Sequence, residues 1–372
     1  ELFDPRANAL RERRRENAAH VAVSGLERAS YDTSWGSLGA TLFAEARRRG
    51  LSGTTFHPTL FATLETTRLV AGVDARVRSG QAGAWHGALW GRRETSEVRD
   101  PLGELTLAAD TEGARDAIET LGATAGWRGR PIDALTLDLF ADGRTERFAP
   151  EKSRLALASV RATRLAAGLG TDAELRASEA LRLSFSGRID ARRDDADGAR
   201  GPGGTTLGVS TDLAPSGHVG ASLRLRDEAT FSVHAGALER PPSFVELYGD
   251  RGALLGDPSL RPERALSLDA GFQGDLASRS VRLGYELVGF ASAARDLIVF
   301  EELGEGTLVA KNVDSATIVG AEIVLELAAR SLETRASYTL LLTENTSEAP
   351  LVRGRPLPGR PVHDLSYDAA YR

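Results

Sequence analysis

The chain has 372 residues, contains no cysteine and no methionine, and carries a net charge of −6. The lack of cysteine excludes a disulfide framework, a thiolate metal site and a cysteine nucleophile. The acidic balance argues against a nucleic-acid partner. Residues 1–9 show none of the basic, apolar or cleavage features of a signal peptide. We therefore interpret the chain as an excised segment, or as a mature chain without its front end.

Length alone would predict two or three domains. However, no linker rich in proline and serine divides the chain, and one local pattern recurs from end to end. No stretch approaches the roughly 18 consecutive apolar residues of a spanning helix. The mean hydropathy is −0.23, which a β-barrel also produces, because its strands alternate lipid-facing and lumen-facing residues. We expect a single domain over 1–372.

The recurring pattern is a two-residue alternation of apolar and polar side chains. It covers residues 135–139, 181–190, 219–226, 321–327 and 332–340, whereas the strand ends within 68–115 are not assigned. Alternation over about eight residues predicts a strand with one apolar and one polar face. We count roughly sixteen such segments, many of them as long as the ~9–11 residues of a tilted spanning strand.

The alternation also predicts which side chains face lipid and which face the lumen of a barrel. The apolar set expected to face lipid is Leu181, Leu183, Phe185, Val219, Leu223, Leu225, Ile323 and Leu325. The charged set expected to face the lumen is Arg182, Arg188, Arg224, Arg226, Glu322, Glu326, Glu333 and Arg335. So many inward charges indicate a wide, wet or plugged lumen rather than one filled by packed side chains.

Connections of two different lengths separate the expected strands. Short turns are expected at 128–131, 226–228 and 273–277, and long polar loops at 48–57, 142–152, 192–216, 239–263, 293–316 and 342–362. Alternation alone also fits a soluble β-sandwich. The alternation of short and long connections favours an antiparallel transmembrane β-barrel, with short periplasmic turns and long extracellular loops. We therefore predict an all-β fold of this kind.

The middle of the chain contains a recognisable segment. A strand-like stretch at 231–239 runs into Arg240-Pro-Pro-Ser-Phe-Val-Glu-Leu-Tyr-Gly, followed by Gly256-Asp-Pro-Ser-Leu-Arg-Pro-Glu and a further strand-like stretch at 265–272. This order resembles the mid-barrel signature of TonB-dependent receptors, with Asp257 where that family usually has asparagine. Residues 312–322 and 355–363 resemble two later segments of the same family, and the early residues 4–8 resemble an external loop more weakly.

This resemblance implies a partial barrel. Family barrels have about 22 strands, and a plug domain with a short energy-coupling box precedes them. We expect 1–372 to lack the plug and the first and last strands. The resemblance further implies a Gram-negative cell outer membrane, contact with outer-membrane lipid, and TonB-driven uptake of a small-molecule or metal-chelate ligand such as a ferric siderophore, cobalamin or a glycan. No cofactor is expected.

Two other functional classes stay open at this point. The chain could be a passive porin-like or structural outer-membrane barrel, such as a subunit of an envelope assembly. It could also be an outer-membrane enzyme, but it has no Gly-x-Ser-x-Gly elbow, no His-Glu-x-x-His motif and no phosphate-binding loop. We assign no catalytic residue and no metal ligand.

The candidate ligand contacts are Arg240, Phe244, Glu246 and Tyr248, which lie in an expected extracellular loop. External loops carry the binding functions of such scaffolds. The alternative is that this segment only shapes the loop, because the two prolines after Arg240 remove backbone donors and end a strand.

Two charge clusters are weighed as well. Asp194, Asp195 and Asp197 are expected in an external loop, but calcium needs six to eight oxygens in a defined geometry, so a solvated loop is favoured. A basic run near the N-terminus could contact anionic lipopolysaccharide, but acidic residues interrupt it, and a solvated loop or strand edge is favoured. Its residues are Arg11, Arg13, Arg14 and Arg15.

Overall fold

The computed structural model describes twelve segments of the chain. They are residues 2–4, 9–11, 16–52, 58–80, 83–105, 114–152, 160–197, 208–248, 254–304, 307–347, 353–357 and 359–371. The backbone of these residues lies almost entirely in one antiparallel sheet, and α1 (Phe244–Tyr248) is a helix of 5 residues. No helix in the described part of the chain is long and apolar enough to cross a membrane.

The sheet has 16 strands, and consecutive strands pair with each other along it. Its path contains β3 (His20–Asp32), β4 (Gly36–Gly50), β5 (Thr63–Ser79), β6 (Gly83–Arg99), β7 (Ala114–Ile132), β8 (Leu135–Lys152), β9 (Arg161–Arg176), β10 (Leu181–Asp197), β11 (Val209–Arg226), β12 (Ala229–Arg240), β14 (Glu263–Ala277), β15 (Val281–Gly304), β16 (Thr307–Ala329), β17 (Leu332–Asn345) and β18 (His363–Tyr371). The short β13 (Leu254–Leu255) lies off this path and pairs in parallel with β16. A separate hairpin, β1 (Leu2–Asp4) with β2 (Ala9–Arg11), pairs outside the sheet.

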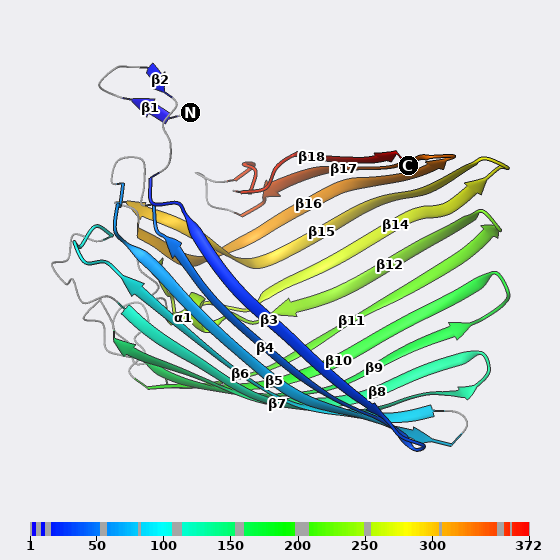
Figure 1. Ribbon diagram of the computed structural model, residues 1–372, viewed down its shortest axis with the longest axis horizontal. Coiled ribbons are helices and arrows are strands. Elements are labelled where there is room, and N and C mark those ends of the chain that lie inside the picture. The colour runs from blue at the N-terminus through cyan, green and yellow to red at the C-terminus, as the bar shows by residue number, and fades with distance from the viewer. Residues whose placement is uncertain are drawn as a thin grey trace.

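The sheet curls strongly, and its long strands are tilted (Figure 1). The described strands do not close it into a ring, because β3 and β18 each have a neighbour on one side only. This is the wall of a transmembrane β-barrel that is present in part. The all-β antiparallel fold and its partial character are therefore as predicted.

Short and long connections lie at opposite ends of the wall. The connections at one end are the short turns 33–35, 80–82, 133–134, 177–180, 227–228, 278–280 and 330–331. Most connections at the other end are long, and the longest is 241–262, which contains α1 and β13. This asymmetry matches the expected periplasmic turns and extracellular loops.

Several predicted strand ends are wrong. Residues 142–152 belong to β8, and 293–316 is a strand hairpin interrupted only at 305–306. The turns expected at 128–131 and 273–277 lie inside β7 and β14. At the long-loop end the strands run further than a membrane requires, and beyond the lipid a charged residue is tolerated in a strand as readily as in a loop. At the short-turn end β7 and β14 run on to the turns 133–134 and 278–280.

The pairing register separates the two faces of the wall. Each residue shares its face with its direct cross-strand partner, so the faces can be followed from strand to strand. Arg182 pairs with Ser222, Leu183 with Ala221, and Glu326 with Arg335. Followed in this way, the apolar residues predicted to face lipid lie on one face and the charged residues predicted to face the lumen lie on the other, except at a β-bulge between Arg224 and Arg226. There Leu225 has no direct partner, and Arg226 pairs with Ala229 on the outward side of β12. The predicted sidedness is therefore confirmed for the other fourteen residues.

The outer face carries an uncharged band on nearly every strand. Leu89, Leu169 and Leu266 point outward with exposed fractions of 60%, 68% and 65%. Apolar surface of this extent is stable only against lipid or a partner. Trp85 and Trp127, direct cross-strand partners, lie on this face near the short-turn end, as in the aromatic girdles that mark membrane interfaces.

Candidate ligand-capture site

Ion pairs run across the lumen-facing side of the strands toward the long-loop end. Arg164 of β9 donates two hydrogen bonds to Asp194 of β10, with Nε–Oδ1 and Nη2–Oδ2 distances of 2.7 and 2.9 Å. Arg192 continues the row by donating to Asp212 of β11 at 2.9 Å. Only 5% of the Arg164 side chain is exposed. A buried guanidinium needs such partners, because an unpaired charge away from water is strongly destabilising.

The loop after β12 folds inward onto this row. Phe148 of β8 is 1% exposed and stacks against both Phe244 and Tyr248 of α1, with ring centroids 5.8 Å apart in each case. The guanidinium of Arg164 lies over the Phe244 ring, 5.0 Å from its centroid, in a cation–π contact. The helix is thus held against β8 and β9 on the lumen side.

The segment that begins α1 is held by a charge-paired clasp. Arg240 donates from Nη1 and Nη2 to Glu246 at 3.0 Å each, and from Nε and Nη2 to Glu263 of β14 at 2.6 and 2.8 Å. The backbone N–H of Ser243 donates to Glu246 at 2.7 Å, and the N–H of Glu246 donates to the Ser243 hydroxyl at 3.3 Å. This reciprocal pair is a capping box, in which serine and a glutamate three residues later satisfy free amides at a helix start.

The electrostatics of α1 follow from this clasp. Burial by itself would raise the pKa of the Glu246 carboxyl, but hydrogen bonds from Arg240 and Ser243 outweigh burial and lower the pKa below its ordinary value. Burial, together with the nearby carboxylate of Asp194, raises the pKa of Tyr248 to about 12. Glu246 is therefore charged and Tyr248 is neutral at physiological pH.

Contacts on the far side of the loop complete its attachment. Leu247, Leu260 and Ala310 form a small buried cluster between the loop and β16. The side chain of Asn312 accepts a hydrogen bond from the backbone N–H of Arg261 at 2.8 Å and donates to its carbonyl at 3.0 Å. Residues from three separate segments of the sequence therefore fix one loop.

All four predicted ligand contacts lie in this assembly. Arg240 ends β12 and is exposed, and Tyr248 is half-buried, whereas Phe244 and Glu246 are buried. Sequence reasoning missed the inner-wall residues that receive the loop, Phe148 and Arg164 among them. Phe148 fell within a segment expected to be a loop.

The predictions for the three aspartates and for the basic run near the N-terminus have different outcomes. Asp194, Asp195 and Asp197 lie on β10 rather than in a loop, so Asp194 points into the lumen toward Arg164, and the other two point outward. The loop prediction was wrong because β10 extends past the membrane. No group of acidic or histidine side chains suited to a metal ion occurs in the described segments. The side chains of the basic run 11–15 lie outside the described residues.

Comparison with known proteins decides the family. The family described as TonB dependent receptor-like, beta-barrel matches residues 5–372, nearly the whole chain. The chain belongs to the TonB-dependent receptor β-barrels. Its sequence resemblance to that family is therefore confirmed. No curated protein sequence matches it significantly.

Solved structures of the same fold agree. The copper transporter OprC superposes with a TM-score of 0.74 at 17% identity, covering 96% of this chain and 57% of that one. The FrpB iron transporter of Neisseria meningitidis gives 0.71 at 13% identity, with coverages of 95% and 56%. The siderophore receptor PiuA of Acinetobacter baumannii gives 0.72 at 11% identity, with coverages of 95% and 62%. The chain thus spans less than two thirds of each of these proteins, all of which are transporters or receptors.

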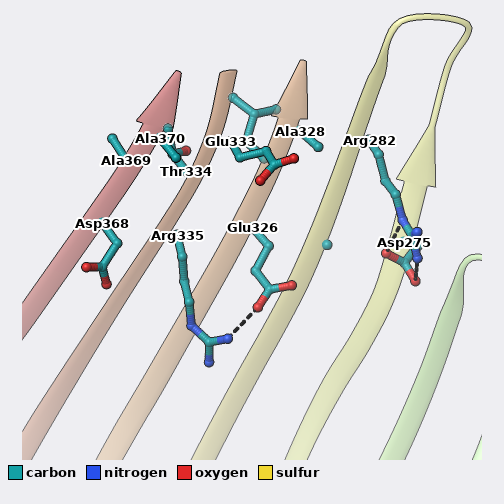
Figure 2. Close-up of a pocket in the computed structure, with 12 residues that line it drawn as sticks. Asp275, Arg282, Glu326, Ala328, Glu333, Thr334, Arg335, Asp368, Ala369 and Ala370 are labelled. Atoms are coloured by element: carbon teal, nitrogen blue, oxygen red, sulfur yellow. Dashed lines mark hydrogen bonds and ion pairs between the residues drawn. The ribbon is translucent and has the colours of Figure 1, made fainter. Parts of the chain in front are cut away.

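A second charged region of this TonB-dependent receptor barrel lies near the short turns. A hollow of about 560 Å³ lies on the lumen side of β14 to β18, and Figure 2 shows the side chains that line it. Arg335 donates to Glu326 at 2.6 Å, and Arg282 donates to Asp275 at 3.1 Å. Two further carboxylates, Glu333 and Asp368, also line the hollow. The inner wall is therefore charged at both ends.

Proposed function

We propose that this chain forms the outer-membrane wall and capture loops of a receptor that imports a scarce nutrient with energy from the TonB complex. The ligand would be a small molecule or metal chelate, such as a ferric siderophore, cobalamin or a glycan. The observation that carries the proposal is the packing of α1 against Phe148 and Arg164. A loop fixed over a wide charged lumen suits selective capture, whereas a passive pore needs an open path.

The four candidate residues divide into two roles. Arg240 is exposed and Tyr248 is half-buried, so both side chains can contact a ligand at the long-loop end. Phe244 and Glu246 are buried by Phe148 and by the clasp, so they position the loop. The mixture of guanidinium, phenol and aromatic surface suits an anionic, ring-bearing chelate.

Energy would reach the ligand through a plug domain inside the barrel. The hollow lined by Asp275, Glu326 and Asp368 faces the lumen at the periplasmic end, where a plug would contact the wall. Four carboxylates and two arginines line it, which favours a basic plug surface. The plug and the TonB complex are partners in this proposal, and the location is the Gram-negative outer membrane.

Uptake in cells tests the proposal. The complete gene would be expressed in a Gram-negative host lacking its own receptors, and uptake of iron-55 siderophores and cobalt-57 cobalamin measured. We expect accumulation of at least one ligand, and its loss after deletion of the TonB gene or addition of a protonophore. Replacement Tyr248→Ala should reduce uptake, whereas Arg188→Met, on the same wall but away from α1, should leave it unchanged. Uptake that ignores both TonB and the protonophore would instead establish a passive barrel.

A further inference from the structure

The outer face of β3 carries a charge where the other strands carry none. Glu27 points outward, because it pairs directly with Leu42 of β4, whose side chain is 48% exposed on the lipid-facing side. In the described part of the wall, every other charged side chain on this face lies near one of the two ends of its strand. A lipid-facing charge is unfavourable, and an ionisable residue at membrane depth marks an interaction by default.

Two neighbours fix the depth of Glu27 in the uncharged band. Tyr31, an exposed aromatic residue on the same face of β3, lies four positions toward the short turn. Arg48 is the first outward charge on β4, and it lies six positions beyond Leu42 toward the long loops. At about 3.3 Å per residue and a tilt of about 40°, Glu27 lies about 10 Å from the level of Tyr31 and about 15 Å from that of Arg48. Together these distances span about 25 Å, the height of the apolar band of such barrels, so Glu27 lies near mid-membrane.

The side of Glu27 toward β4 offers no partner. In the part of the chain that the structure describes, the Glu27 carboxylate forms no ion pair and no side-chain hydrogen bond. The adjacent Arg28 points into the lumen, where it lies 3.6 Å from Asp74. On the outer face Glu27 is surrounded by one apolar residue directly opposite and four small residues next to it: Leu42, Gly25, Ala29, Ala40 and Ala44.

The other side of Glu27 is the free edge of the sheet. β3 pairs with β4 and with no other strand that the structure describes (Figure 1). A closed barrel requires a further strand there, because unpaired backbone groups are costly in hydrocarbon. Such a strand places one residue directly opposite Glu27 on the outer face, with the two Cβ atoms about 4.5–5.5 Å apart. Within the barrel, only that strand can bring a new side chain to the carboxylate.

We infer that the strand completing the barrel beside β3 presents an arginine or lysine directly opposite Glu27. Opposite charges in direct cross-strand positions stabilise a sheet, and a carboxylate with charge-assisted hydrogen bonds is less costly in hydrocarbon than an isolated one. The pair also specifies the register of closure, because a slip of two residues would keep both side chains on the outer face but separate two charges in lipid. This inference rests on the membrane-spanning barrel of the proposed function, but not on transport.

The sign of a stability change tests the inference. The complete receptor and its Glu27→Leu variant would be folded into liposomes, and their unfolding in guanidinium chloride followed by heat-modifiable gel mobility. We expect the leucine to leave a cation alone in lipid, so the unfolding equilibrium constant should rise about thirtyfold or more. If Glu27 has no partner, or is paired by a separate membrane protein, the purified variant should be at least as stable as the wild type, because a charge has left the lipid. That result would overturn the inference.

A control variant separates the charge from the size of the new side chain. Ala29→Leu enlarges the next outward residue of β3 without removing a charge, and it should leave the unfolding equilibrium constant unchanged or lower it. A loss of stability equal to that of Glu27→Leu would show that this face does not tolerate bulk, and it would overturn the assignment of a lost ion pair.

Cross-linking and a double variant identify the partner. Glu27→Cys would be paired with cysteines placed along the neighbouring strand of the complete receptor, and the position that forms a disulfide most completely lies directly opposite. We expect an arginine or lysine there, and an apolar residue would refute the inference. Replacing this basic residue by leucine in the Glu27→Leu background should restore the stability of the wild type. Loss of nutrient uptake in a receptor whose Glu27 variants behave as expected would contradict the proposed function and leave this inference standing.

Discussion

Removing Arg164 should free α1 from the inner wall. The replacement Arg164→Met keeps much of the side-chain volume but deletes both hydrogen bonds to Asp194 and the cation–π contact with Phe244. Breaking a buried ion pair from one side costs about 3–5 kcal/mol, and the low end of this range applies here because Arg192 still lies 3.6 Å from the Asp194 carboxylate. If about 3 kcal/mol of this is expressed as opening of the loop, the open population rises roughly 150-fold.

Hydrogen exchange followed by mass spectrometry measures this opening. The N–H of Leu247 donates to the carbonyl of Ser243 at 3.0 Å, so its exchange reports on α1 directly. The matched control is Arg188→Met. Arg188 also forms ion pairs on the lumen wall, with Asp142 at 2.7 Å and Asp190 at 2.6 Å, but it does not contact α1. Similar exchange at Leu247 in both variants would show that Arg164 does not hold the loop.

Three further predictions follow from other parts of the wall. The lowered pKa of Glu246 means that its stabilisation is complete above its ordinary pKa and is lost as the pH falls through the folded-state pKa. A spin label on α1 should therefore become mobile only at a pH below the ordinary pKa of a glutamate carboxyl, and Glu246→Gln should abolish that pH dependence; an unchanged transition would contradict this. Because the chain contains no cysteine, a cysteine introduced in place of Leu223 or of Arg224 can be spin-labelled specifically. Oxygen should relax the spin label at position 223, and a water-soluble nickel chelate should relax the label at position 224. Equal accessibility of the two labels would refute the register. A Cβ on Gly122 would lie 2.5 Å from the Trp90 ring, so Gly122→Ala should destabilise the barrel by about 1–3 kcal/mol in urea titrations; an unchanged midpoint would show that the indole moves aside freely.

The face of the wall on which each side chain lies was predictable, because strand geometry fixes it. Successive side chains point to opposite faces, so once Arg182 and Leu183 are assigned to one strand, they must lie on different sides. A lipid-facing charge is costly, which tells the polar side from the apolar one. These two local rules suffice for β10, β16 and β17, and for β11 as far as its β-bulge between Arg224 and Arg226.

Strand ends were less predictable, because the rule that separates the faces stops at the membrane boundary. Beyond it, Arg147 on the outer face and Arg144 on the inner face are equally acceptable. The charged stretch 142–152 therefore looks like a loop in the sequence although it is the end of β8. The same reasoning applies to 293–316, where β15 and β16 extend as a hairpin.

The site was predictable only where its contacts are local. Ser243 and Glu246 have the spacing of a capping box, which is visible in the sequence. Phe148 and Phe244 are distant in the chain, and only the curvature of the sheet brings them together. Their contact has no local signature. The family resemblance located the loop correctly, but it did not supply the wall that receives it.

The edges of the sheet bear on how the chain works. β3 and β18 each present one row of backbone N–H and C=O groups that no described strand pairs. In hydrocarbon each unsatisfied group costs several kcal/mol, so an open wall is not stable in a membrane. Both edge strands nevertheless carry membrane-type patterning: Leu365 and Tyr367 point outward on β18 and are exposed by 72% and 64%. Such surfaces are built for lipid and for neighbouring strands rather than for water. Because transport requires a closed lumen, the activity proposed here belongs to the barrel that these edges complete, and the present wall contributes its capture loop and its lipid-facing surface.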